Sequence, residues 1–113
     1  MYILKNSNES SIFPPDETQI IDKKAKLKHK QYDFISGTII LTDKALYFKS
    51  LKGSLSDEPL RIKLENIHVL RKSKSIKLVS NRLFISDNQG DEFIFAVAGR
   101  NELLDKIETQ MNA

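Results

Sequence analysis

Two apolar strands joined by a tight turn constrain this chain most. The first strand begins at Gly37, the second ends at Phe48, and Asp43 lies in the turn between them. Apolar side chains recur at every second position of each strand, which is the period of a sheet with one buried face. An isolated hairpin buries too little surface to be stable, so other segments must cover this face. The apolar residues that define it are Ile39, Leu41, Leu46 and Phe48.

The rest of the chain is patterned as that cover. Between residues 60 and 70 the apolar alternation breaks at Glu65-Asn66, which predicts a kink in a bent strand. The turn at Asp87 to Gly90 predicts a further hairpin, because glycine suits the left-handed position that closes such a loop. Other strands are predicted at 23–32, 76–79, 82–86 and 92–97.

The C-terminus is patterned as a helix. Residues 99–111 place apolar side chains on one helical stripe, with Asn101 as the expected N-cap. We therefore expect a mainly β fold, a barrel of about seven antiparallel strands capped by a C-terminal α-helix. Residues 1–11 are polar and are expected to be mobile, whereas 12–113 should form a single domain whose first residues tuck Phe13 against the barrel.

The hairpin also resembles the signature of the GRAM family within the pleckstrin-homology (PH-like) superfold. In that family a glycine opens a strand, as Gly37 does, a Thr-Asp pair such as Thr42-Asp43 turns it, and an aromatic such as Phe48 closes the return. The resemblance extends over 12 to about 111. It implies a PH-like barrel and a binding module for membrane phosphoinositides, other anionic lipids or protein partners.

Catalytic and cofactor chemistry is missing from the sequence. The chain has no cysteine, which excludes disulfides, thiol catalysis and cysteine-held metals. Its histidines, His29 and His68, belong to no ligand spacing, and its four glycines form no phosphate-binding loop. We expect no enzyme activity, no catalytic residues, no metal and no cofactor. No stretch approaches a membrane span and no secretory signal is present, so a cytoplasmic location is expected, with peripheral membrane contact.

Charge is the remaining chemistry. The net charge is +3, but residues 23–77 carry fourteen basic and five acidic groups. If one face of the folded domain gathers these cations, it attracts a polyanion such as an acidic membrane, at about 1 kcal/mol per basic residue. The candidate anionic-lipid-binding residues form two clusters, Lys24, Lys26, Lys28 and Lys30 in the first and Arg71, Lys72, Lys74 and Lys77 in the second.

The resemblance transfers to these residues only in part. Many phosphoinositide-binding PH domains carry a lysine followed, after a gap, by Lys/Arg-x-Arg across the first two strands. This chain offers Lys28 and Lys30, but 31–36 contains no basic residue. We therefore expect diffuse electrostatic attraction to anionic lipids, phosphoinositides included. Recognition of one particular headgroup is less expected.

Other interpretations of the basic clusters remain open. They can be an ordinary solvated surface, or lysines that protect an exposed strand edge from aggregation. A protein-interaction module, acting through an edge strand or as a homodimer, is the alternative function. Nucleic acid is disfavoured, because base stacking needs exposed aromatics among the cations. The aromatics expected in the core are Phe48, Phe84, Phe93 and Phe95, and those expected at the surface are Tyr32, Phe34 and Tyr47.

Overall fold

A computed structural model of the chain describes residues 13–28, 35–51, 59–73 and 81–113. Its elements are β1 (Gln19–Lys28), β2 (Ile35–Thr42), β3 (Ala45–Ser50), β4 (Leu60–Lys63), a 3-10 turn η1 (Leu64–Asn66), β5 (Ile67–Ser73), β6 (Arg82–Asp87), β7 (Glu92–Val97) and α2 (Arg100–Met111). The strands form one antiparallel sheet of order β4-β3-β2-β1-β7-β6-β5. The expected fold class, seven strands and a C-terminal helix, is confirmed.

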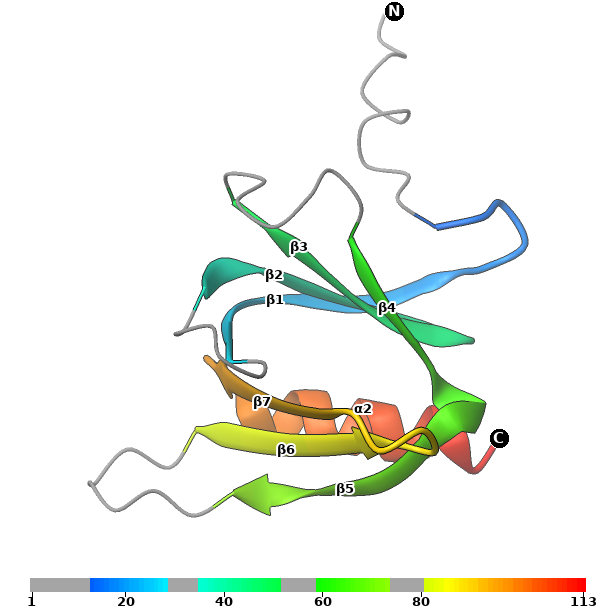
Figure 1. Ribbon diagram of the computed structural model, residues 1–113. Coiled ribbons are helices and arrows are strands. Elements are labelled where there is room, and N and C mark those ends of the chain that lie inside the picture. The colour runs from blue at the N-terminus through cyan, green and yellow to red at the C-terminus, as the bar shows by residue number, and fades with distance from the viewer. Residues whose placement is uncertain (1–12, 29–34, 52–58, 74–80) are drawn as a thin grey trace, which may run out of the picture.

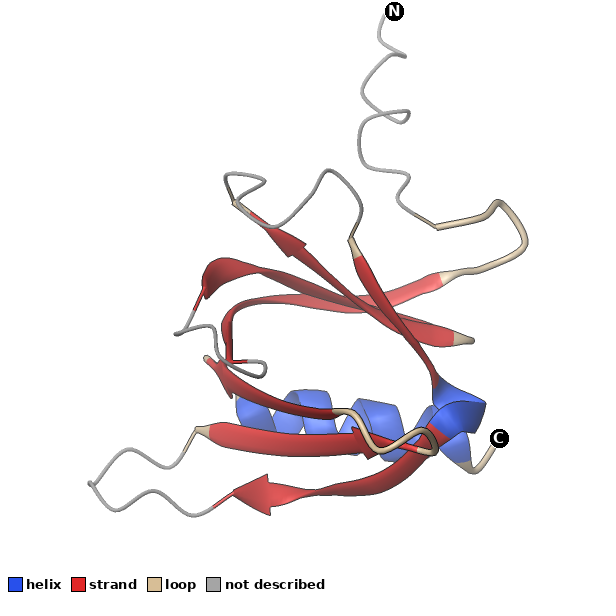
Figure 2. Cartoon of the chain, in the orientation of Figure 1, coloured by secondary structure: helices blue, strands red, loops and turns tan. Residues whose placement is uncertain are grey.

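The sheet bends into two halves around one core. Figure 1 shows β1 to β4 in the upper half and β5 to β7 in the lower half, with α2 behind β6 and β7. Figure 2 shows how fully strands dominate the described chain, with helix only at η1 and α2. Two fully buried side chains of α2, Leu103 and Ile107, join the same core cluster as Leu83 and Ile85 of β6. The helix therefore covers the core side of the lower half.

The hairpin of β2 and β3 has the predicted faces and register. Ile39 pairs with Phe48 and Leu41 pairs with Leu46, and all four side chains are buried in the core. A Cβ atom at Gly37 would collide with the Lys49 carbonyl oxygen and the Phe48 ring, so the strand needs glycine there. The period of two in the sequence thus reports a real buried face.

The kink predicted at Glu65-Asn66 is the 3-10 turn η1. One bent strand was expected, but the structure has two strands with different neighbours: β4 pairs with β3, and β5 pairs with β6. The turn carries the chain from one end of the sheet order to the other. The strand predicted at 76–79 and the segment 1–11 lie outside the described residues.

The helix begins differently from the prediction. Its N-cap is Gly99, which adopts a left-handed conformation with φ of 80°, and Leu103 donates the first helical hydrogen bond to the Gly99 carbonyl. Asn101 lies inside the helix, so its predicted role as N-cap is wrong. Lys23 of β1 instead secures the first turn, because its Nζ atom lies 2.6 Å from the Glu102 carboxylate. Sequence could not reveal a partner so distant along the chain.

Candidate anion-binding surface

The first basic cluster lies on one face of β1. Ala25 and Leu27 point into the core, while Lys24, Lys26 and Lys28 alternate with them and are exposed. The strand predicted at 23–32 is confirmed for residues 23–28, and these lysines share one exposed face of it. Lys30 lies outside the described residues.

β1 is not an edge strand. It pairs with β2 on one side and with β7 on the other. The pairing with β7 runs over residues 25–28, so Lys26 and Lys28 do not protect an open strand edge, and that interpretation is wrong for them. Lys24 lies one residue before this pairing and is paired with Thr38 of β2.

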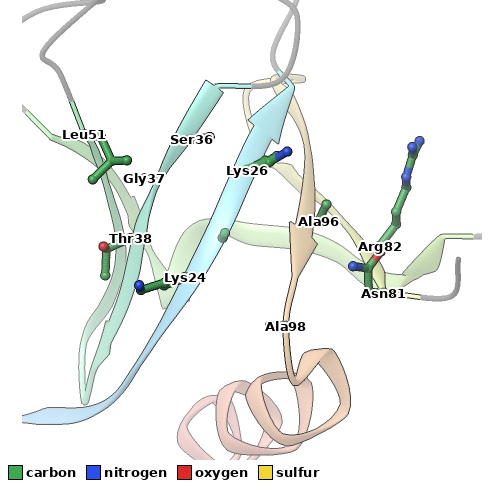
Figure 3. Close-up of a pocket in the computed structure, with 11 residues that line it drawn as sticks. Lys24, Lys26, Ser36, Gly37, Thr38, Leu51, Asn81, Arg82, Ala96 and Ala98 are labelled. Atoms are coloured by element: carbon green, nitrogen blue, oxygen red, sulfur yellow. The ribbon is translucent and has the colours of Figure 1, made fainter.

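A groove of about 590 Å³ lies beside the lysines on this outer face. It forms because small side chains stand opposite them: Ser36 pairs with Lys26 across β2, and Ala96 pairs with Lys26 across β7. Figure 3 shows Lys24 and Lys26 on β1, Leu51 beyond β2 and Arg82 on the far side of β7. The groove thus has short side chains between its cationic and apolar borders, and an anionic group can approach the sheet there.

The Arg82 border of the groove was missed by sequence reasoning. Arg82 is an isolated arginine, so a search for runs of basic residues passes over it, although its alternation with the buried Leu83 would have placed it on the outer face. Leu51, which is 71% exposed, begins the polar loop in which sequence suggested Leu51 or Leu55 as an apolar contact with lipid headgroups. That Arg82 and Leu51 lie beside the lysines of β1 becomes visible only when the pairing of the strands is known.

The second basic cluster divides between two faces. Arg71 pairs with Phe84, Phe84 with Ile94, and Ile94 with Lys28. Arg71 and Lys28 therefore lie in one row on the outer face. Lys72 belongs to the next row, with the buried Leu83, so its side chain lies on the opposite face at the edge of the sheet. Lys74 and Lys77 lie outside the described residues.

Two aromatic predictions are wrong. Phe84 was expected in the core but is half-buried on the outer face, where the Arg71 guanidinium lies 4.4 Å from its ring centre. Tyr47 was expected at the surface but is 2% exposed. Phe13 covers it, with the two ring centres 6.0 Å apart. Tyr32 and Phe34 lie outside the described residues.

Tyr47 belongs to a buried polar network around Glu17. The Glu17 carboxylate accepts hydrogen bonds from the hydroxyls of Thr42 (2.7 Å) and Tyr47 (2.9 Å) and from Arg61 Nη2 (2.8 Å). Arg61 Nε also donates to the Tyr47 hydroxyl oxygen at 2.8 Å. The N-terminal segment is held further by Thr18, whose amide donates to the Asp43 carboxylate at 2.9 Å. The network fastens this segment over the outer face of β3 and β4.

The electrostatics of the network favour a charged Glu17. Burial acts to raise the pKa of Glu17, but hydrogen bonds from Thr42, Arg61 and Tyr47 outweigh it, so the pKa lies below its usual value. Burial raises the pKa of Tyr47, which stays a neutral donor. These groups satisfy one another's hydrogen-bonding capacity, so the network acts as a structural clamp that holds the N-terminal segment.

No protein-family model matches the sequence, and comparison with curated proteins finds no match. Solved structures do match. The C-terminal domain of an unknown protein from Leishmania infantum has a TM-score of 0.79 and 19% identity, covering 96% of this chain and 99% of that one. The Vps36 N-terminal PH domain has a TM-score of 0.67 and 15% identity, covering 88% and 83%.

A third similar structure is the Slm1 PH domain in complex with inositol 4-phosphate, with a TM-score of 0.58 and 12% identity, covering 83% of this chain and 95% of that chain. Identities this low establish the fold alone. The chain has a PH-like fold. Within the described residues, α2 is too short and too polar to cross a bilayer, and no other helix there reaches that length.

Proposed function

We propose that residues 12–113 form a GRAM-like member of the PH-like fold, a non-enzymatic module that attaches to anionic membrane lipid at the cytoplasmic surface. The observation that carries this proposal is the gathering of Lys24, Lys26 and Lys28 on one exposed face of β1, beside a groove with short side chains. Lys30, Lys74 and Lys77 remain candidate contributors by sequence alone.

The strength of such attachment follows from the number of cations. A basic residue near an acidic membrane contributes about 1 kcal/mol, so three lysines support weak, reversible binding that salt weakens. Leu51 stands exposed at the border of the groove and can add an apolar contact with the headgroup region. The fold shared with a PH domain solved with inositol 4-phosphate supports testing phosphoinositides among the lipids.

Cosedimentation with lipid vesicles tests the proposal. Wild type is compared with Lys24→Glu/Lys26→Glu on neutral, phosphatidylserine and phosphoinositide vesicles of matched charge, at low and physiological salt. The double change should weaken binding to both anionic vesicles roughly thirtyfold, since about 2 kcal/mol is lost. A preference for phosphoinositide at equal charge would add recognition of the headgroup.

The matched control is Lys44→Glu/Lys63→Glu, which makes the same charge change at exposed positions away from the groove. It should bind nearly as well as wild type. Equal loss in both variants would mean that only net charge matters, and absence of binding at low salt would reject membrane attachment.

A protein-interaction module is the second candidate. The sheet order leaves β4 and β5 at its two ends, each with one strand edge that pairs with no described strand. Such edges can accept a strand from a partner or from a second copy. Sedimentation velocity over a range of concentrations tests the homodimer: a concentration-dependent mass supports it, and a constant monomer mass rejects it.

A further inference from the structure

The outer face of the sheet carries a row of four side chains that runs from β1 across the three strands of the lower half. Cross-strand pairing orders them as Lys28 in β1, Ile94 in β7, Phe84 in β6 and Arg71 in β5. The two ends are exposed cations, and the two central side chains are half-buried and apolar. No described helix or strand covers this face, because α2 packs on the core side.

The cation at the edge of the row is held in place. The Arg71 guanidinium stacks on the Phe84 ring at 4.4 Å, which fixes its plane and leaves its N–H edges for a carboxylate. Two ion pairs join described residues to each other, Lys23 to Glu102 and Arg61 to Glu17, and neither uses Arg71 or Lys28. The row therefore presents two cations around an apolar centre.

The molecule contains a precedent for what covers such a pair. Arg61 lies on the other terminal strand, β4, directly opposite Tyr47, with its guanidinium carbon 5.6 Å from the ring centre. There the chain's own N-terminal segment, which turns between Pro14 and Glu17, supplies a carboxylate from Glu17 to the arginine and a ring from Phe13 to the aromatic. In this protein, an arginine beside an aromatic ring thus binds a segment that provides one acidic and one apolar side chain.

We propose that the row Lys28–Ile94–Phe84–Arg71 docks an extended acidic peptide of a partner protein, with an apolar side chain between two acidic ones. Lys28 and Arg71 are three strand spacings of about 4.8 Å apart, roughly 14 Å. Four residues of extended chain, at about 3.4 Å each, span nearly the same distance, and side chains two apart point the same way. The pattern that fits is acid-x-apolar-x-acid, its central side chain resting between Phe84 and Ile94.

The test is titration of ¹⁵N-labelled protein with a seven-residue peptide in which two glutamates flank a central leucine at that spacing, with serine elsewhere. The amide signals of Arg71, Phe84 and Ile94 should shift, and Arg71→Glu should weaken binding at least tenfold. Arg71→Lys should lose part of the affinity, because lysine keeps the charge but not the stacked fork. Lys44→Glu, which makes a charge change of the same size and sign at an exposed position outside both surfaces, should leave peptide affinity nearly unchanged.

Three results would overturn the proposal. The first is the absence of shifts in this row at saturating peptide with the protein folded. The second is equal binding of a peptide with the two glutamates adjacent, which would reduce the effect to charge. The third is that something other than the peptide binds to this row. Single-stranded RNA or anionic vesicles would then shift these signals although the peptide does not. Alternatively, the protein would self-associate with rising concentration, and Arg71→Glu would remove that association. Ile94→Thr, a conservative change on the exposed face, checks the row independently and should also weaken the peptide.

Discussion

Each end of the sheet carries an arginine opposite an aromatic side chain, but the surroundings of the two pairs differ. At one end Arg61 faces Tyr47, and at the other Arg71 faces Phe84, each arginine on a terminal strand opposite its aromatic partner. The first pair is closed over by the N-terminal segment, and Tyr47 is 2% exposed. The second pair is open, and its aromatic is only half-buried. The first pair is structural because Glu17 supplies its carboxylate, whereas no ion pair between described residues supplies one to Arg71, and this difference underlies the proposed docking of an acidic peptide.

Removal of the carboxylate from the closed pair should have the largest effect. Glu17→Ala leaves Arg61 without its partner and two hydroxyl groups without their acceptor, in a site where the Glu17 side chain is 1% exposed. We expect a loss of about 3 kcal/mol in the free energy of unfolding, measured by urea denaturation. The control is Glu102→Ala, whose exposed pair with Lys23 should give no resolvable change. Equal effects would contradict the structural role of the closed pair.

Replacement of the two arginines, one at a time, should give the next largest difference in stability. Arg61→Ser strands a buried carboxylate and should lower the free energy of unfolding by about 2 kcal/mol. Arg71→Ser removes only an exposed stacking contact and should lower it by about 0.5 kcal/mol. Urea denaturation of both variants measures the difference. If Arg71→Ser proved the more destabilising, the open pair would also be structural and the comparison would fail.

Phe13 provides a smaller test of the cover. Its ring packs 6.0 Å from that of Tyr47, and Phe13→Ala should cost about 1 kcal/mol of stability, since the ring is only partly buried. In a Tyr2→Phe/Tyr32→Phe background, which leaves Tyr47 as the one tyrosine, the fluorescence should become more accessible to an added quencher. Leu51→Ala, at an exposed position, should leave both stability and quenching unchanged.

Acid should weaken the closed pair selectively. The pKa of Glu17 is lowered in the folded protein from an ordinary value of 4.5. Its contribution to stability is therefore complete well above pH 4.5, and it is lost as the pH falls through the lowered folded pKa. The stability difference between wild type and Glu17→Gln should shrink as the pH is lowered below 4.5. A difference that grows on acidification would show that the sign of the shift is wrong.

Sequence predicted the elements of this fold because local periodicity reports them. The alternation around Ile39 and Phe48 specified the hairpin and its buried face, and the broken alternation at Glu65-Asn66 marked the turn that joins the two halves of the sheet. What sequence could not specify was pairing at long range. Glu17 finds Arg61 and Lys23 finds Glu102 only in the folded chain, so the clamp and the true start of the helix were missed.

The basic surface was predicted only where lysines recur at every second position of one strand. Lys24, Lys26 and Lys28 alternate with buried residues, and that pattern is visible in the sequence. Arg71 and Lys72 are neighbours in one strand and therefore point to opposite faces, but which of the two points outward is seen only from the pairing of β5 with β6. Phe84 alternates with the buried Leu83 and Ile85, which marks it for the outer face, but the apolar character of the strand was followed instead and the aromatic was assigned to the core.

We propose above that the lysine face of β1, and not the closed end of the sheet, meets the membrane. The most direct measurement is signal broadening of ¹⁵N-labelled protein by phosphatidylserine nanodiscs that contain a paramagnetic lipid. We expect broadening at Lys24, Lys26, Thr38 and Leu51, with Tyr47 and Arg61 unaffected. Broadening centred on Arg61 or on α2, with the β1 signals unchanged, would contradict this proposal.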